Sequence, residues 1–485
     1  MAGTSGAPQG STGPGGSAEP SLSGYPTEVF KAYDIRGIVP AQFHADLARA
    51  VGAAVVEVLG VRVCDGGPGA VVVGQDMRPS GDDLVAAFAD GVCSRGCDVV
   101  RIGLASTDGL YFASGDLGLP GAMFTASHNP AEYNGIKVCR AGAAPVGMES
   151  GLREIRDLVR DGMPPPSGPT GMVRRADTMP SYAAFLRGLV DLSAIRPLSV
   201  VVDAGNGMAG ITVPAVLGAE AGLGPLPLRI DPMYFELDGT FPNHEANPID
   251  PDNLRDLQAR VVSRGADVGL AFDGDADRCF VVDERGVAVS PSAITALIAR
   301  RELQRNPGAT IIYNCISSRV VPEVVAQAGG VGERTRVGHS FIKARMAETG
   351  AVFGGEHSGH FYFADFWRAD SGMLAAMHVL AALGSAPEGT PLSALLEEFD
   401  RYAASGEINS VVSDAPAATQ RVRQAFSSRP GLTFDDLDGM TVSAAEWWFN
   451  LRPSNTEPLL RLNVEAVDGG TMEAVRDEVL AIVRS

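Results

Sequence analysis

Cysteine is sparse in this sequence, with six residues among 485, which is too few for a disulfide scaffold. Cys93 and Cys97 lie one helical turn apart, but no second pair follows at the spacing of a zinc site. We therefore interpret both residues as buried thiols.

Long apolar runs are also missing, because no uninterrupted stretch approaches the roughly 20 residues that cross a bilayer. Positive charge is in deficit: 39 Lys and Arg stand against 58 Asp and Glu, which gives a formal net charge of −19. A chain this acidic is a poor non-specific ligand for nucleic acid. We expect neither a nucleic-acid partner nor a membrane partner.

The first stretch, residues 1–24, has almost no bulky apolar side chains and lacks the basic and apolar segments of a secretory signal. We expect it to be a disordered tail, and we expect the protein to be cytoplasmic.

The remaining composition, 45% hydrophobic and 20% charged, is typical of a globular protein. The length allows three or four domains of about 150 residues. Strand-like and helix-like stretches alternate as far as about Leu383, which predicts α/β domains, and a smaller α+β domain follows. We place the domains at residues 25–175, 176–287, 288–395 and 396–485. Among the predicted elements are helices at 41–59, 81–95 and 470–483 and strands at 70–74, 98–104, 198–203, 268–272 and 310–314.

The stretch Thr125–Pro130 follows an apolar segment, Gly121–Phe124, that is typical of a buried strand end. Pro130 prevents a helix from starting before it, so Ser127 is expected on a tight surface loop. There its hydroxyl could act as a nucleophile, with His128 beside it and Lys137 ten residues further on. A polar turn is the alternative, because Ser, Asn and Pro are common turn residues.

The stretch Asp273–Arg278 carries aspartates at its first, third and fifth positions and follows a strand-like segment, Val268–Phe272. Three carboxylates at this spacing can converge on one hard cation. With Glu284 at position twelve the loop imitates an EF-hand, but an arginine replaces the required glycine and the flanks are strand-like. A Mg²⁺ site that also receives phosphate fits better, and a solvated acidic turn is the alternative.

The loop Gly354–His360 contains three glycines, an acid, a hydroxyl and two histidines. Glu356 and Ser358 would point the same way on an extended segment and could bind neighbouring hydroxyls of a sugar. A zinc site formed by Glu356, His357 and His360 is the alternative, although it lacks the regular spacing of ligands on a helix.

Three more stretches could contribute to a site. Arg452–Pro458 offers a guanidinium, two hydroxyls and turn N–H groups, which suit an anion or form a simple β-turn. His339 and Lys343 lie one helical turn apart and could both face a cleft. The glycine-rich stretch Ala204–Gly210 lacks the dinucleotide spacing and the Lys-Ser/Thr ending of a phosphate loop, which favours close strand-to-helix packing.

Together, the serine, aspartate, Gly-Glu-His-Ser-Gly-His and Arg-Pro-Ser-Asn-Thr loops resemble those of the α-D-phosphohexomutase family, in the same order and at similar spacing. Within that family the chain is similar to the phosphomannomutase/phosphoglucomutase group from about Tyr25 onward. The resemblance implies three similar mixed α/β domains and a C-terminal α+β, TATA-box-binding-protein-like domain around one cleft.

The resemblance also implies roles for individual residues. Ser127 would be a phosphoserine, and Mg²⁺ would be held by Ser127, Asp273, Asp275 and Asp277. Glu356 and Ser358 would bind the sugar, and the non-reacting phosphate would be bound by Arg452, Ser454, Asn455 and Thr456. The remaining residues that would line the cleft are Tyr33, Arg36, His128, Lys137, Arg278 and His339.

The implied reaction interconverts the 1-phosphate and 6-phosphate of mannose or glucose through a hexose 1,6-bisphosphate, which also serves as activator. The general base stays open among His128, Lys137 and His339. Two departures from relatives concern the substrate contacts: His357 stands where Met is frequent, and Arg461 is the candidate substitute for a basic residue further along the last strand. Alternatives are a phosphoglucosamine mutase, a metal-dependent sugar phosphatase and a non-catalytic sugar-phosphate binder. A monomer or weak homodimer is expected.

Overall fold

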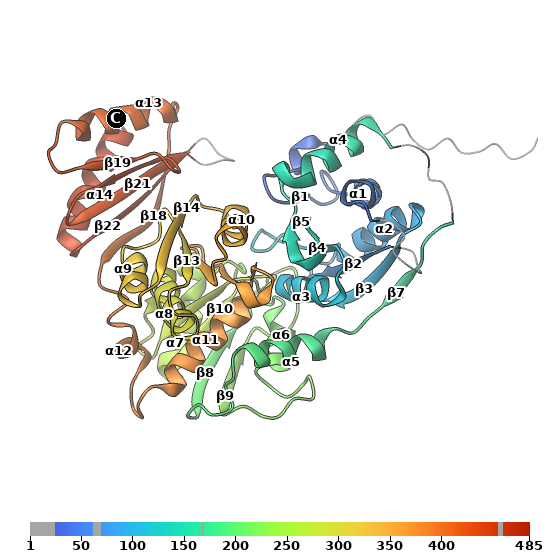
Figure 1. Ribbon diagram of the computed structural model, residues 1–485, viewed down its shortest axis with the longest axis horizontal. Coiled ribbons are helices and arrows are strands. Elements are labelled where there is room, and N and C mark those ends of the chain that lie inside the picture. Colours follow the sequence, from blue (N-terminus) through green and yellow to red (C-terminus); the bar gives the residue numbers. More distant parts are fainter. Residues whose placement is uncertain (1–24, 62–68, 164, 166–168, 454–458) are drawn as a thin grey trace, which may run out of the picture.

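The computed structural model describes residues 25–61, 69–163, 165, 169–453 and 459–485. The predicted tail therefore lies outside the described residues. Within them, no helix is both long enough and apolar enough to cross a membrane. The described residues form four sheets, each with its own helices (Figure 1).

The first sheet is mixed. Its strands are β1 (Ile35–Ile38), β2 (Ala70–Gln75), β3 (Asp98–Leu104), β4 (Gly121–Phe124), β5 (Tyr133–Arg140), β6 (Ala144–Pro145) and β7 (Val173–Arg175). The order is β1-β5-β4-β2-β3-β7, with β6 beside β5; β2 pairs in parallel with β3 and β4, and β5 runs antiparallel to β4. The helices are α1 (Ala45–Leu59), α2 (Gly81–Ser94), α3 (Thr107–Leu117) and α4 (Arg153–Asp161), with short turns η1 (Thr27–Val29), η2 (Ala141–Ala143) and η3 (Met148–Leu152).

The second sheet has the order β12-β11-β10-β8-β9. Here β8 pairs in parallel with β9 and β10, and β11 runs antiparallel to β10. The strands are β8 (Leu198–Asp203), β9 (Leu228–Met233), β10 (Val268–Phe272), β11 (Cys279–Asp283) and β12 (Ala288–Val289). The helices are α5 (Met179–Leu189), α6 (Ala209–Val216), η4 (Pro251–Leu254) and α7 (Arg255–Arg264).

The third sheet repeats this pattern in the order β14-β13-β15-β16-β17. β13 pairs in parallel with β14 and β15, and β16 runs antiparallel to β15. The strands are β13 (Thr310–Asn314), β14 (Val331–Thr335), β15 (Phe353–Gly355), β16 (Phe361–Phe363) and β17 (Ala369–Asp370). The helices are α8 (Pro291–Arg305), α9 (Val320–Gln327), α10 (His339–Thr349), η5 (Ala364–Phe366), α11 (Gly372–Ser385) and α12 (Leu392–Leu396).

The fourth sheet is entirely antiparallel, in the order β18-β22-β21-β20-β19. It lies at the upper left of Figure 1, with both helices of this unit packed on it. The strands are β18 (Ala403–Val411), β19 (Thr433–Asp435), β20 (Met440–Ser443), β21 (Trp447–Pro453) and β22 (Leu459–Ala466), and the helices are α13 (Ala415–Ser427) and α14 (Gly469–Val483).

The three mixed sheets place one loop at the same topological position, between the third parallel strand and the antiparallel strand that follows it. These are the β4–β5, β10–β11 and β15–β16 loops, and they contain Ser127, the three aspartates and Glu356. In α/β sheets, ligands bind outside the carboxyl ends of the parallel strands. The repeated architecture therefore delivers three polar loops from three sheets.

Packing fixes these sheets relative to one another. One continuous apolar cluster includes Phe112 of α3, Leu270 of β10, Leu297 of α8 and Leu380 of α11. Helix α11 is buried along nearly its whole length, which its sequence reflects by being apolar on all sides.

Most predicted element limits agree with the structure. The strands at 98–104, 198–203, 268–272 and 310–314 are confirmed. The helix predicted from residue 41 begins instead at Ala45, because His44 is extended (φ −141°, ψ 170°) and caps the helix by accepting a hydrogen bond from the Leu47 N–H at 3.4 Å. Cys93 and Cys97 are buried free thiols, as interpreted. The domain limits at residues 175, 287 and 395 stay predictions.

Candidate active site

A cavity of about 870 Å³ opens where the four units meet. Of the thirteen described residues to which the family resemblance assigns a role, eight line it, and Asp273, Asp275, Asp277, Glu356 and Ser358 do not. The first unit contributes Tyr33, Arg36, Ser127, His128 and Lys137, the second Arg278, the third His339 and His360, and the fourth Arg452 and Arg461.

Ser127 adopts the left-handed conformation (φ 50°) just after β4 ends. Its Oγ donates to Asp273 Oδ2 at 2.8 Å and accepts from Arg278 Nη2 at 3.1 Å. The tight loop is confirmed, but the expected surface position is wrong, since Ser127 is only 4% exposed. The β10–β11 loop covers it and supplies both polar partners.

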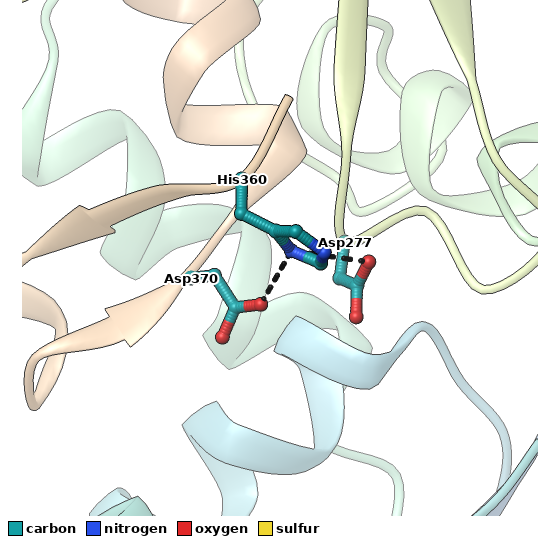
Figure 2. A group of neighbouring side chains, drawn as sticks. All are labelled: Asp277, His360 and Asp370. Carbon is teal, nitrogen blue, oxygen red and sulfur yellow. Dashed lines mark hydrogen bonds and ion pairs between the residues drawn. The ribbon is translucent and has the colours of Figure 1, made fainter. Parts of the chain in front are cut away.

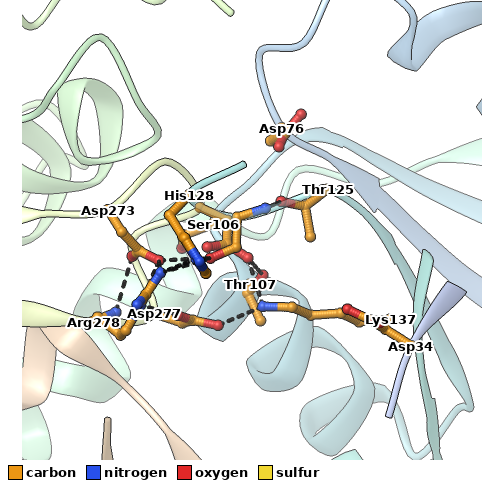
Figure 3. A network of polar contacts seen from close by, with 12 residues as sticks. Asp34, Asp76, Ser106, Thr107, Thr125, His128, Lys137, Asp273, Asp277 and Arg278 are labelled. Atoms are coloured by element: carbon orange, nitrogen blue, oxygen red, sulfur yellow. Dashed lines mark hydrogen bonds and ion pairs between the residues drawn. The ribbon is translucent and has the colours of Figure 1, made fainter. Parts of the chain in front are cut away.

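His128 lies beside Ser127, with its Nδ1 in contact with Arg278 Nη2 and 3.3 Å from Ser127 Oγ. The positive charge of Arg278, together with burial, lowers the pKa of His128 well below its ordinary value. Arg278 also donates from Nε to Asp273 Oδ2 at 2.8 Å. Figure 3 shows Arg278 between the imidazole and the carboxylate.

The three aspartates of the β10–β11 loop are buried, and their carboxylates come within 4.8 Å of one another. Asp275 Oδ1 and Asp277 Oδ1 accept no hydrogen bond from the residues that the structure describes. Buried carboxylate oxygens without a donor fit a hard cation such as Mg²⁺, and Ser127 Oγ stands directly beside them. Burial, opposed by Arg278, raises the pKa of Asp273 to about 7.

Lys137 on β5 reaches the same loop. Its Nζ lies 2.7 Å from Asp275 Oδ2. It also lies 2.6 Å from Asp277 Oδ2 (Figure 3). Burial acts to lower the pKa of Lys137, but the two carboxylates outweigh it and raise this pKa well above its ordinary value. Lys137 is therefore held protonated, which makes it a poor general base.

His360 lines the cavity. An isolated antiparallel β-bridge joins its backbone to that of Arg278. Figure 2 shows its ring between Asp277 and Asp370, with Nδ1 2.9 Å from Asp370 Oδ2. Burial acts to lower the pKa of His360, but Asp277 and Asp370 raise it overall. The alternative zinc site of Glu356, His357 and His360 is not formed among the described residues, where His360 groups with these two aspartates instead.

The prediction for helix α10 is half right. His339 lines the cavity with its ring against Tyr33, at 4.8 Å between centroids, and burial lowers its pKa to about 3. Lys343 does not line this cavity. Its Nζ is buried against Asp370 Oδ1 at 2.7 Å and over the Tyr111 ring at 4.3 Å. Packing of α10 against the first unit thus turns the lysine inward.

Glu356 and Ser358 do not alternate on an extended segment. The β15–β16 connection is a tight turn, in which the Glu356 N–H donates to His360 O and the Gly359 N–H donates to Glu356 O. Ser358 Oγ donates to Glu356 Oε2 at 3.0 Å, and the Gly338 N–H donates to Oε1 at 3.1 Å. The predicted extended segment was wrong because β15 and β16 pair as a hairpin, although the two side chains still lie together. Burial raises the pKa of Glu356.

Two arginines of the fourth unit lie opposite each other on neighbouring strands, Arg452 on β21 and Arg461 on β22. Arg452 Nη2 lies 2.6 Å and Arg461 Nη1 3.4 Å from the Glu407 carboxylate. Both arginines line the cavity. This is the position expected of Arg461 if it substitutes for the basic residue that relatives carry further along the last strand. Three of the residues assigned to this loop lie outside the described residues: Ser454, Asn455 and Thr456.

Arg36 of the first unit also lines the cavity, and it donates to Asn129 Oδ1 at 2.5 Å.

The fold decides two other interpretations of the sequence. Strands flank the aspartate loop and Glu284 accepts hydrogen bonds from Ser393, so an EF-hand is excluded. The stretch Ala204–Gly210 packs against the aspartate loop, where a Cβ on Gly207 would lie 2.7 Å from the Gly274 carbonyl oxygen.

Sequence reasoning missed the partners that organise the site. Arg78, Asp370 and Glu407 each bind a site residue or a site loop, at sequence separations of 49, 10 and 45 residues. His360 was named only as an alternative zinc ligand, although its place directly after Gly359 in a polar loop could have marked it as a cavity residue.

The chain matches the models of all four domains of one family, with the descriptions "Phosphoglucomutase/phosphomannomutase, alpha/beta/alpha domain I" at residues 27–163, domain II at 180–286, domain III at 290–402 and "C-terminal domain" at 407–482. It is 39% identical over 440 residues to a phosphomannomutase of Escherichia coli K12, covering 90% of this chain and 94% of that protein. It is 40% identical over 462 residues to phosphohexose mutases of Xanthomonas campestris, covering 94% and 99%.

Among solved structures, a phosphoglucomutase/phosphomannomutase family protein of Burkholderia thailandensis superposes with a TM-score of 0.83 at 33% identity, covering 95% of this chain and 97% of that chain. Family matches to each unit and identities near 39% over most of the chain agree with the geometry of the cavity. The chain belongs to the phosphoglucomutase/phosphomannomutase family, and it is a phosphohexomutase, an isomerase.

Proposed function

We propose that this phosphohexomutase interconverts the 1-phosphate and 6-phosphate of mannose, glucose or both, with Ser127 as the residue that carries the phosphoryl group. The observation that carries the proposal is the 2.8 Å contact between Ser127 Oγ and Asp273 Oδ2, at a cavity that Ser127 lines together with Arg452 and Arg461 of the fourth unit. A candidate nucleophile and a candidate anion site thus line one cavity, with a candidate cation site directly beside the nucleophile.

In the proposed reaction, a free hydroxyl of the hexose phosphate attacks phosphorus on Ser127. The serine O–P bond breaks, a sugar O–P bond forms, and the hydroxyl proton passes to a base. The resulting 1,6-bisphosphate turns within the cavity, and Ser127 Oγ attacks its other phosphorus. That sugar O–P bond breaks, the serine O–P bond forms again, and the released sugar oxygen takes back the proton from the base. Phosphoryl transfer is catalysed mainly by positioning and charge stabilisation. Arg278 supplies positive charge at the serine, and Lys137 supplies it at the neighbouring Asp275 and Asp277.

The three aspartates are the residues that would hold Mg²⁺, which when bound would neutralise charge on the transferred group. Arg452 and Arg461 would bind the phosphate that is not reacting. A sugar phosphatase transfers the phosphoryl group to water and does not need this second anion site. The presence of the second site therefore favours the mutase mechanism.

For the general base, the charges around the cavity favour His360. The lowered pKa values of His128 and His339 make them weak bases, and Lys137 is held protonated. Asp370 binds His360 Nδ1, which orients the ring and leaves Nε2 for proton exchange with a sugar hydroxyl.

The test is a coupled assay with mannose, glucose and glucosamine 1-phosphates, in Mg²⁺ and a trace of glucose 1,6-bisphosphate, with released inorganic phosphate measured in parallel. The proposal predicts 6-phosphate formation from mannose or glucose 1-phosphate without stoichiometric release of phosphate. Turnover confined to the glucosamine compound, or phosphate release equal to turnover, would replace it with one of the two alternatives.

A further inference from the structure

Arg78 lies behind the Ser127 loop, and no step of the proposed reaction uses its charge. It follows β2 by three residues, and its side chain is 0% exposed. The guanidinium donates four hydrogen bonds to main-chain carbonyls of the serine loop: to Ser127 at 2.9 Å, Asn129 at 2.6 Å, Pro130 at 2.7 Å and Tyr133 at 2.8 Å. One buried side chain thus engages the loop on both sides of Pro130.

Neighbours on two units hold Arg78 in place. Asp76, also 0% exposed, accepts from the Arg78 backbone N–H at 3.0 Å and from Nε at 3.3 Å. The loop before α7 in the second unit covers the other side, with the Phe241 ring 5.3 Å from the guanidinium carbon. Gly239 lies so close that a Cβ there would stand 2.6 Å from Arg78 Cα.

The contacts of Arg78 matter because Ser127 adopts a left-handed conformation that residues other than glycine rarely keep without support. Its carbonyl also meets the aspartate loop, where a Cβ on Gly274 would lie 2.5 Å from the Ser127 oxygen. A rotation of this peptide would therefore move Ser127 Oγ relative to Asp273 and Arg278.

We propose that Arg78 is a positioning residue for phosphoryl transfer, whose guanidinium fixes the main chain of residues 127–133 so that Ser127 Oγ faces Asp273 and Arg278. The inference rests on the proposed role of Ser127 as the phosphoryl carrier. Lysine cannot replace Arg78, because an ammonium lacks the planar fork that reaches several carbonyls at once.

The test compares Arg78→Lys with wild type and with a matched control, Arg187→Lys. Arg187 also donates to three main-chain carbonyls, those of Val216, Gly218 and Gly224, but these belong to the α6 end of the second unit. Each full-length protein is loaded with glucose 1,6-bisphosphate, phosphate on the Ser127 peptide is quantified by mass spectrometry, and transfer to mannose 1-phosphate is followed by rapid quench.

Wild type and Arg187→Lys should transfer at rates within about twofold of each other, as expected for a site remote from the reacting groups. Arg78→Lys should melt cooperatively yet transfer about a hundredfold more slowly, the cost of a misplaced reacting group. Its KM should change by less than about threefold, since the substrate contacts stay in place. This split between kcat and KM separates positioning from a general loss of stability.

A wild-type transfer rate in Arg78→Lys would refute the positioning role and leave the role of Ser127 intact. Absence of phosphate on the Ser127 peptide of active wild-type enzyme would overturn both. If Arg78→Lys does not melt cooperatively, Asp76→Asn decides, because it keeps the guanidinium and removes its anion. Transfer slowed by at least about tenfold at unchanged KM supports the role, and a wild-type rate overturns it.

Discussion

Ser127 Oγ and Asp273 Oδ2 lie 2.8 Å apart although 146 residues separate them in the chain. The contact joins the β4–β5 and β10–β11 loops, which occupy the same position in two sheets that share the order of four strands, β5-β4-β2-β3 and β11-β10-β8-β9. Gly274 permits it, since the Ser127 carbonyl leaves no space for a side chain there. The proposed nucleophile and the candidate cation site are therefore held together by the contact between these two loops, and the predictions below test this arrangement.

Ser127→Ala should abolish turnover. It should also lower the free energy of unfolding by about 1–3 kcal/mol, because the buried hydroxyl bridges Asp273 and Arg278 and its loss leaves polar groups without a partner. Steady-state kinetics at fixed Mg²⁺ and activator, together with denaturant unfolding, check both effects. Activity within about tenfold of wild type would exclude Ser127 as the phosphoryl carrier.

Lys137→Met should destabilise the protein when Mg²⁺ is absent, by about 3–5 kcal/mol, because it leaves Asp275 and Asp277 buried without their cation. Mg²⁺ bound by the same carboxylates would replace the lost charge, so it should raise the Tm of this variant more than that of wild type. Calorimetry in EDTA and in Mg²⁺ measures the two shifts.

Arg196→Met is the control for this experiment, since Arg196 pairs with Asp267 at 3.2 Å outside the cavity. Its Mg²⁺-induced Tm shift should match that of wild type. An equal shift in Lys137→Met and wild type would show that the lysine and the metal do not share these carboxylates.

Arg452→Lys should weaken binding of both the 1-phosphate and the 6-phosphate, because each substrate would place its non-reacting phosphate against the same guanidinium. Loss of a charge-assisted hydrogen bond predicts about 1.5–3 kcal/mol, or a KM increase of roughly ten- to hundredfold. Arg429→Lys, in the same unit and paired with Glu478, should leave KM unchanged. A KM change for only one of the two substrates would argue against a single phosphate site.

Mannose and glucose phosphates should both be converted. The two sugars differ only at carbon 2, and without a buried group that reads this carbon the discrimination should stay on the order of 1–3 kcal/mol. His357 is not among the residues that line the cavity; it lines a small hollow beside Trp448 and Asn463 instead. His357→Met should therefore leave the ratio of the two kcat/KM values unchanged, and a tenfold change in that ratio would identify His357 as a carbon-2 contact.

The sequence predicted those parts of the site that depend on the order of neighbouring residues along the chain. An apolar strand followed by a polar loop is a local pattern, and it located Ser127, the three aspartates and the strands before them. The order of these loops along the chain identified the family and with it the four-unit fold.

Contacts between distant segments were not predictable in this way. The inward position of Lys343 depends on Tyr111 of another unit. The four hydrogen bonds of Arg78 need the loop to be folded before they exist. Each of these features follows from tertiary packing, which overrides what the neighbouring residues indicate.

The most direct test of the account follows phosphate on Ser127 during a single turnover. Enzyme loaded from glucose 1,6-bisphosphate is mixed with excess mannose 1-phosphate, quenched at intervals and digested, and the phosphorylated peptides are identified by mass spectrometry. Phosphate should be found on the peptide that contains Ser127, and it should pass to mannose 1-phosphate, giving mannose 1,6-bisphosphate, at least as fast as kcat. Phosphate on another residue, or its loss from Ser127 more slowly than kcat, would contradict the account.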